Sequence, residues 1–174
     1  SLKWPVQLLN YYLQSGDISF LEEMYPVAEG LIEYFKKYER YDGLIENVNE
    51  KWNLVDWPEN LRDGYDFDLG TVVGDGCHNV INAFYYGAVK TVNEIREILG
   101  KTGKYDLERI KQAFINAFYR PEKKLFADST VSSHSALHSN VVPLFYGLVP
   151  DDAIDSVINF IREKKLSCGV YMAY

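Results

Sequence analysis

The sequence has few of the residues that mark several large classes of protein. Its two cysteines, Cys77 and Cys168, lie far apart and without a CxxC spacing, so neither a disulfide framework nor a zinc ribbon is indicated. No apolar run approaches the roughly 18 residues that a membrane span needs. The 18 Lys and Arg residues against 25 Asp and Glu give a net charge of −7. This acidity excludes nucleic acid and anionic membranes as expected partners.

Several catalytic and binding motifs are also missing. The sequence contains no G-x-S-x-G, Walker or G-x-G-x-x-G pattern, so an elbow-serine hydrolase, a P-loop enzyme and a dinucleotide binder have no local support. The EF-hand pattern fails as well: counted from Asp66, the third ligand position is Gly70 and the twelfth is Cys77. An irregular calcium site remains the alternative for so many aspartates.

The composition that is present suits an ordinary globular protein. With 174 residues and 47% hydrophobic content, the chain is expected to form a single domain over residues 1–174, and a domain of this size buries about 70% of the surface of its unfolded chain. Aromatic residues are abundant at 15%, including 14 tyrosines. This surplus suits either a carbohydrate ligand or simple core packing.

Apolar residues recur at helical spacing through most of the chain. The pattern predicts helices over about 2–14, 19–38, 78–99, 106–120, 133–147 and 150–165, with the start of another at 167. The expected N-caps include Ser19, in a capping box with Glu22, then Asp106 and Ser133. Gly87 lies within a helix and is expected to allow a close crossing. One short extended piece is expected over residues 125–128.

The lengths of the connections alternate along the chain. They are short near Gly16, 100–104 and 149–150 but long over 41–76 and 121–132. Short links join antiparallel helices as αα-hairpins. The fold class is therefore expected to be all-α, built from antiparallel hairpins in a toroid or solenoid. Its long loops should gather on one rim, where a site would be built.

The longer of these loops combines tryptophan with aspartate. Trp52, Asp56, Trp57 and Asp63 all lie in it. An indole can stack on the apolar face of a sugar ring while carboxylates accept hydrogen bonds from its hydroxyls. The alternative is structural: the tryptophans close the mouth of the core, and the aspartates form turns and caps.

Three histidines complete the candidate site. His134 and His138 have the i, i+4 spacing of zinc-binding HExxH, but Ser135 stands where the glutamate should be. Both are therefore expected to line a site or form polar pairs, without a metal. His78, at the start of a predicted helix, is a candidate for the same rim, with a capping role as its alternative.

Six runs in order along the chain resemble the catalytic domain of bacterial α-L-rhamnosidases, glycoside hydrolase family 78. The similarity covers nearly the whole chain. The runs are NLVDWP at 53–58, RDGY at 62–65, HNVINAF at 78–84, SHSALHSN at 133–140, YGLVP at 146–150 and CGVY at 168–171.

The resemblance implies part of an (α/α)6 toroid, a six-hairpin glycosidase that hydrolyses terminal α-L-rhamnosyl bonds with inversion and without a cofactor. Inversion uses an acid and a base about 6.5–9.5 Å apart. In the family, the acid lies upstream of the segment matching Trp4 and the base downstream of that matching Tyr171. The chain is thus expected to be a central fragment, inactive by itself. The resemblance also implies that the stretch of Asp56 and Trp57 lines the substrate site.

Taken together, these patterns predict a carbohydrate-binding rim with no assigned acid or base. The expected substrate-binding residues are Asp56, Trp57, Trp52, Asp63, His78 and His134. Self-association is expected through helix faces that a partial toroid would leave uncovered. The rival hypothesis is a non-catalytic helical-hairpin scaffold that binds a protein or carbohydrate partner.

Overall fold

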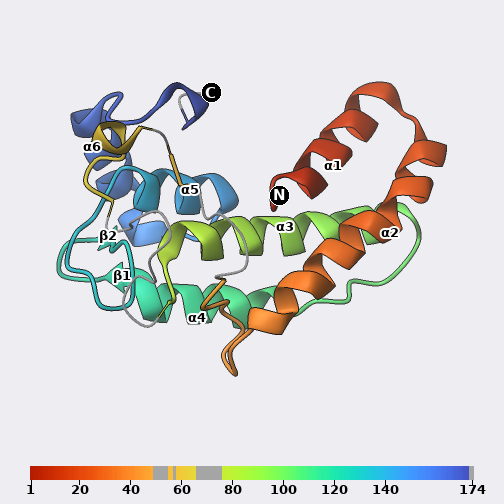
Figure 1. Cartoon of the computed structure of the whole chain (residues 1–174), viewed down its shortest axis with the longest axis horizontal. Helices are drawn as coiled ribbons and strands as arrows, with labels where there is room; N and C mark the ends of the chain where they lie inside the picture. The colour runs from red at the N-terminus through yellow and green to blue at the C-terminus, as the bar shows by residue number, and fades with distance from the viewer. Residues whose placement is uncertain (49–54, 57, 66–75, 173–174) are drawn as a thin grey trace.

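The computed structural model describes residues 1–48, 55–56, 58–65 and 76–172 (Figure 1). Trp52 and Trp57 lie outside this part of the chain. The α-helices are α1 (Trp4–Ser15), α2 (Ile18–Phe35), α3 (Asn79–Ile98), α4 (Leu107–Phe118), α5 (His138–Tyr146) and α6 (Ile154–Lys164). A small antiparallel hairpin joins β1 (Tyr119–Arg120) to β2 (Leu125–Phe126), and the 3-10 turns are η1 (Lys36–Tyr38), η2 (Glu59–Leu61), η3 (Asp151–Ala153) and η4 (Val170–Met172).

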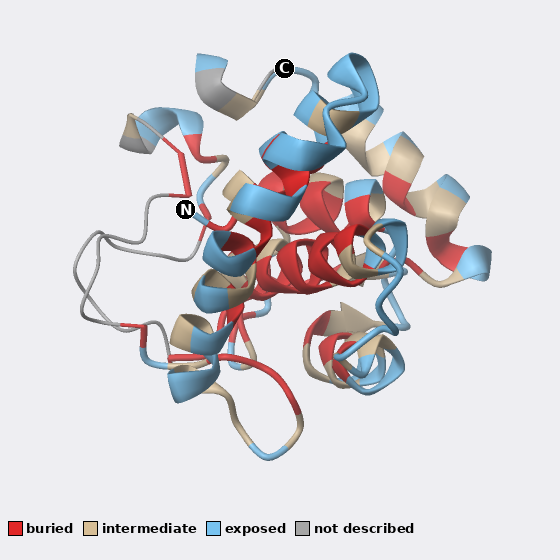
Figure 2. Cartoon of the chain, turned by 90° about the vertical axis from the view of Figure 1, so that its right-hand side faces the viewer, coloured by how far each residue is buried: buried red, intermediate tan, exposed pale blue. Residues whose placement is uncertain are grey.

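Helix α3 is the centre of the fold. It contacts α1, α2, α4 and α5, and Figure 2 shows its largely buried ribbon surrounded by more exposed helices. A helix covered on several sides needs apolar or small residues around most of its circumference, as α3 has in Val80, Ala83, Ala88, Val89 and Val92. The all-α fold class is confirmed. None of the helices in the described ranges combines the length and apolar character that a membrane crossing requires.

The short links begin and end helices by local hydrogen bonds. Gly16 adopts a left-handed conformation at the end of α1, with φ of 70°, and its N–H donates to the Tyr12 carbonyl. Asp17 then caps α2 by accepting from Phe20 N at 3.0 Å. The capping box expected at Ser19 was therefore wrong, because Asp17 fills the N-cap position two residues earlier. The cap at Asp106 is confirmed, with its carboxylate accepting from Arg109 N at 3.0 Å.

The helix expected from Ser133 begins later. Helix α5 starts only at His138, because Ala136 N donates to the Asp128 carboxylate and Leu137 N to that of Asp63 instead of joining a helical turn. His134 and His138 therefore do not share a helical face, and that prediction was wrong. The preceding helix also ends earlier, at Phe118, where the chain turns into the hairpin that includes the expected extended piece.

A glycine in α3 and three helical asparagines determine how closely the helices and the segments between them pack. A Cβ on Gly87 would lie 2.3 Å from the Tyr146 ring, so only glycine permits this approach of α3 to α5 and the expected close crossing is confirmed. Three helical asparagines fix the loops. Each side-chain amide accepts from and donates to the backbone of one residue outside the helices: Asn82 with Ile45, Asn93 with Tyr105 and Asn140 with Phe126 of β2.

Candidate functional site

Two long loops meet at the N-termini of α3 and α5. We call this region, residues 55–56, 58–65 and 127–138, the loop rim. The first loop bonds to the second through Asp63 and Tyr65, and Asp56 bonds to His138 at the start of α5. The rim is therefore a joint between segments more than 60 residues apart in sequence.

Asp56 is a buried anchor in this rim. Its Oδ2 accepts from His138 Nε2 and from Gly169 N, both at 2.7 Å, and its side chain is 0% exposed. Such short distances are typical of hydrogen bonds to a charged acceptor. The carboxylate thus joins the first loop to α5 and to the segment before η4. Trp57, its neighbour and the predicted stacking residue, lies outside the described residues.

Asp63 forms a turn and two further links. It has φ of 50° and precedes Gly64, with φ of 65°, so the Asp-Gly pair makes the turn that its composition suggested. Its Oδ2 accepts from Leu137 N at 2.8 Å and its Oδ1 from Lys164 Nζ at 2.9 Å. Asp63 consequently fixes both the second loop and the end of α6.

His78 occupies the N-cap position of α3, but its side chain makes no capping hydrogen bond. Its Nδ1 lies 2.9 Å from the Tyr65 hydroxyl. That hydroxyl donates to the Asp128 carbonyl at 3.2 Å. Burial lowers the pKa of His78 to about 4, because a charged imidazole loses its hydration there. Near neutral pH the ring is therefore an uncharged part of the core beneath the rim.

His134 is the most exposed of the predicted site residues that the structure describes, with 43% of its side chain accessible. Its Nδ1 lies 2.6 Å from Asp128 Oδ2. Its Cε1 and Nε2 lie beside Gly64, 3.5 Å from where a Cβ there would stand. The imidazole is thus hydrogen-bonded to Asp128 of the second loop and lies beside Gly64 of the first.

Asp128 is the rim residue that sequence reasoning missed. It is completely buried, and its carboxylate also accepts from Ala136 N at 2.8 Å and Ser139 Oγ at 2.5 Å. In the sequence it stands at the end of a short extended piece, like many turn aspartates. The spacing to Ser139 and His134 has no motif that would have identified it.

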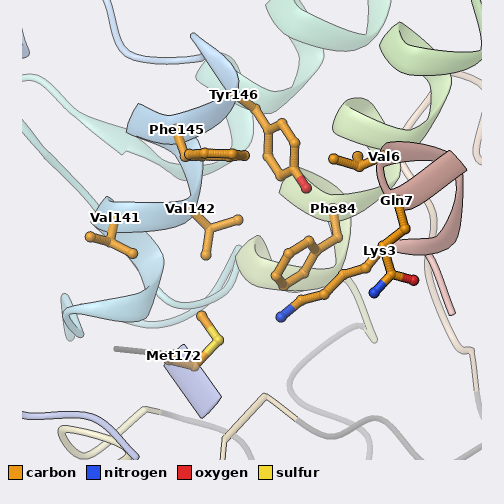
Figure 3. A pocket seen from close by; sticks show the side chains of 9 residues that line it. All are labelled: Lys3, Val6, Gln7, Phe84, Val141, Val142, Phe145, Tyr146 and Met172. Carbon is orange, nitrogen blue, oxygen red and sulfur yellow. The ribbon is translucent and has the colours of Figure 1, made fainter. Parts of the chain in front are cut away.

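No group of three His, Cys, Asp or Glu side chains within the described ranges could hold a metal ion. The clearest cavity, of about 320 Å³, lies elsewhere, between α1, α3 and α5 (Figure 3). Its walls are mainly apolar, including Phe84, Phe145, Tyr146 and Met172. Of the predicted substrate-binding residues that the structure describes, Asp56, Asp63, His78 and His134, none lines this cavity.

Comparison with known families gives one match across the chain. Residues 3–171 match the family described as the bacterial alpha-L-rhamnosidase 6 hairpin glycosidase domain. No curated protein sequence matches significantly.

Solved structures share the fold at low sequence identity. The family 78 rhamnosidase of Bacillus sp. GL1 superposes with a TM-score of 0.74 at 14% identity, covering 96% of this chain and 17% of that one. The Klebsiella oxytoca rhamnosidase with rhamnose bound has a TM-score of 0.72 at 12% identity, covering 93% and 29%. The α-L-rhamnosidase of Dictyoglumus thermophilum has a TM-score of 0.67 at 24% identity, covering 94% and 17%. The chain thus spans less than a third of each of these proteins.

Proposed function

Because the chain belongs to the family of bacterial α-L-rhamnosidase six-hairpin glycosidase domains, we propose that it is part of a catalytic domain that hydrolyses terminal α-L-rhamnosyl bonds with inversion. The match over residues 3–171 carries this proposal. The chain's own contribution is the loop rim, which supplies contacts to the sugar. The substrate-binding residues predicted from the sequence are Asp56, Asp63, His78 and His134, together with Trp52 and Trp57, acting either as contacts or as supports of the contacts.

The geometry supports different parts for these residues. His134 offers an exposed imidazole nitrogen, whereas Asp56 and Asp63 act chiefly by fixing the loops that carry the sugar contacts. Trp57, the next residue in the sequence, is the proposed stacking residue for the sugar ring. His78 supports the rim from below as a neutral, buried ring.

The acid and base of the reaction come from outside this chain. Asp56, Asp63 and Asp128 each already accept from two or more internal donors. A carboxylate whose oxygens already accept from donors of the protein is not free to contact a leaving oxygen, and these three carboxylates hold the loops together instead. The chain alone is therefore expected to be inactive.

An aryl α-L-rhamnoside assay tests this proposal. The chain alone should show no turnover, and a longer protein that includes it should release the aryl group with inversion, as anomer-resolved NMR would show. Asp56→Asn in that longer protein should reduce kcat/KM at least tenfold. Asn116→Ala, on the exposed side of α4, is the matched control. Unchanged kcat/KM in Asp56→Asn, or turnover by the chain alone, would contradict it.

We also propose that the chain self-associates through the apolar cavity between α1 and α5. Phe145 borders this cavity and is 75% exposed, so its ring and the apolar cavity walls form one contiguous apolar surface, the kind that marks an interaction site. Sedimentation velocity should show a concentration-dependent dimer or larger species. Phe145→Ser should shift it toward the monomer, whereas Val131→Ser, at a similarly exposed apolar side chain on the loop rim, should not.

A further inference from the structure

We propose that Asp128 is a positioning residue that holds His134 as the Nδ1–H tautomer, so that Nε2 faces the loop rim as a hydrogen-bond acceptor for a sugar hydroxyl. This inference deepens the proposed function and rests on it. It concerns one atom of the rim and a buried carboxylate that does not itself touch the sugar.

The tautomer follows from the partners of Asp128. Its Oδ2 lies 2.6 Å from His134 Nδ1. A carboxylate can only accept a hydrogen bond, so Nδ1 must carry the proton. In a neutral imidazole the other nitrogen, Nε2, is then an acceptor. Among the described residues Nε2 has no hydrogen-bond partner, and it lies beside Gly64, which has no side chain.

His134 is held by its main chain as well as by its ring, more firmly than a side chain of this exposure requires. Asp128 binds the His134 segment through its main chain as well, since Asp128 N donates to the His134 carbonyl at 3.0 Å. His134 N donates to Ser132 Oγ, also at 3.0 Å. An exposed side chain ordinarily keeps its rotamer freedom. Fixing such a group through a buried carboxylate is how binding sites orient a ligand contact in advance.

Other roles for Asp128 account for less of this arrangement. Its Oδ1 accepts from Ala136 N and Ser139 Oγ, and these two bonds alone would hold the start of α5. The bond from Oδ2 adds nothing to that task, because it ends on a ring that is 43% exposed. Its consequence is the orientation and tautomer of His134.

Histidine NMR tests the tautomer directly, because the chain has only three histidines. In the ¹⁵N-labelled chain, at a pH at which the imidazole is neutral, His134 should show a protonated Nδ1 and an unprotonated Nε2. In Asp128→Asn, Oδ1 still accepts from Ala136 and Ser139, but the amide NH₂ replaces Oδ2. A donor then faces Nδ1, and His134 should change to the Nε2–H form.

Ser139→Ala is the matched control. It removes one donor from the same carboxylate, at 2.5 Å, but leaves the bond from His134. The tautomer should therefore stay as in the wild type. The wild-type spectrum requires no variant, so it decides the tautomer even if a variant fails to fold. An Nε2–H or evenly mixed tautomer in the wild type would overturn the proposal.

Titration with L-rhamnose tests the sugar contact. In the wild type and Ser139→Ala, rhamnose should shift both the His134 Nε2 resonance and the Gly64 amide. In Asp128→Asn the affinity should fall about fivefold, the effect of losing one hydrogen bond. A Gly64 response with an unmoved Nε2, or with equal affinity in Asp128→Asn, overturns this inference alone. No response at either position overturns the proposed function too.

Discussion

The region around the short 100–104 link, which we call the short-link side (Glu29, Glu33, Arg96 and residues 99–106), differs from the loop rim in the kind of polar contact that holds it together. On the short-link side, Lys104 Nζ donates to Glu29 at 3.1 Å and to Glu33 at 2.9 Å, and Arg96 also reaches Glu29 at 3.1 Å. These side chains are 17–45% exposed. On the rim, Asp56 and Asp128 accept from histidines and backbone N–H groups while their side chains are 0% exposed.

This difference in exposure should determine how well each region tolerates substitution of its polar side chains. Exposed ion pairs contribute about 0–1 kcal/mol each and weaken with salt. A buried carboxylate, once removed, leaves buried donors unsatisfied, at about 1–3 kcal/mol for each donor. The short-link side should therefore accept substitution, whereas the rim should hold its groups in one geometry. A preorganised rim is what a binding site needs.

The largest effect should come from Asp128→Ala. This change leaves Ala136 N, Ser139 Oγ and His134 Nδ1 without their acceptor, so the free energy of unfolding should fall by about 4 kcal/mol. Urea denaturation followed by circular dichroism measures the loss. Asp128→Asn keeps the Oδ1 acceptor and should lose less than half as much. Equal losses in the two variants would mean that the Oδ1 acceptor, which asparagine keeps, contributes little to stability.

Asp56→Ala should destabilise the rim by a smaller amount, about 3 kcal/mol, because His138 Nε2 and Gly169 N lose their acceptor. The loss should be uneven. Hydrogen exchange at the backbone amide of Gly169 should accelerate strongly. The backbone amide of Asn93, within α3, should instead exchange at the rate set by global unfolding. Unchanged protection at Gly169 would show that Asp56 does not anchor the segment before η4.

Mild acid should weaken the rim before it affects the short-link side. The pKa of His78 is about 4 in the folded chain against about 6.5 when unfolded, so between these values the unfolded state binds more protons. Stability should therefore fall as the pH drops, by about 2 kcal/mol between pH 7 and pH 5. Denaturation at both pH values measures this loss, and His78→Gln should remove most of it. On the short-link side, the hydrogen bond from Lys104 lowers the pKa of Glu33, so that pair should persist until the pH falls below the usual range of glutamate.

The smallest effect should follow Glu29→Gln on the short-link side. Glu29 accepts from both Arg96 and Lys104, but all three side chains are partly exposed, so the loss should stay below about 1 kcal/mol. Chemical denaturation by urea with and without 1 M NaCl makes the comparison. Salt should abolish the difference between Glu29→Gln and wild type but not that between Asp128→Ala and wild type. A loss of 2 kcal/mol or more in Glu29→Gln would remove the contrast between the two regions.

Sequence patterns predicted the helices well where local chemistry decides. Gly16, Asp106 and Gly147 end or begin helices as expected, because each acts on its own turn. The N-cap predicted at Ser133 was wrong, because the carboxylates of Asp63 and Asp128 accept from the N–H groups that a helix would have used. Asp63 is distant in sequence, and Asp128 stands in no recognisable motif. Long-range acceptors of this kind have no local signal.

The candidate site was predictable as a rim but not as a set of contacts. Alternating link lengths and the acidic loop indicated where Asp56, Asp63 and His134 would gather. They could not indicate that Asp56 is buried against His138, or that Asp128 supports His134. Both facts depend on how α3 and α5 pack, which Gly87 and the helical asparagines determine.

Amide chemical-shift mapping with L-rhamnose tests most directly whether the loop rim is the sugar-binding region. Rhamnose should shift the amides of residues 63–65 and 134–138, with saturation in the millimolar range or below, and leave those of residues 99–106 on the short-link side unmoved. Shifts confined to the short-link side, or none at the rim at saturating rhamnose, would contradict it.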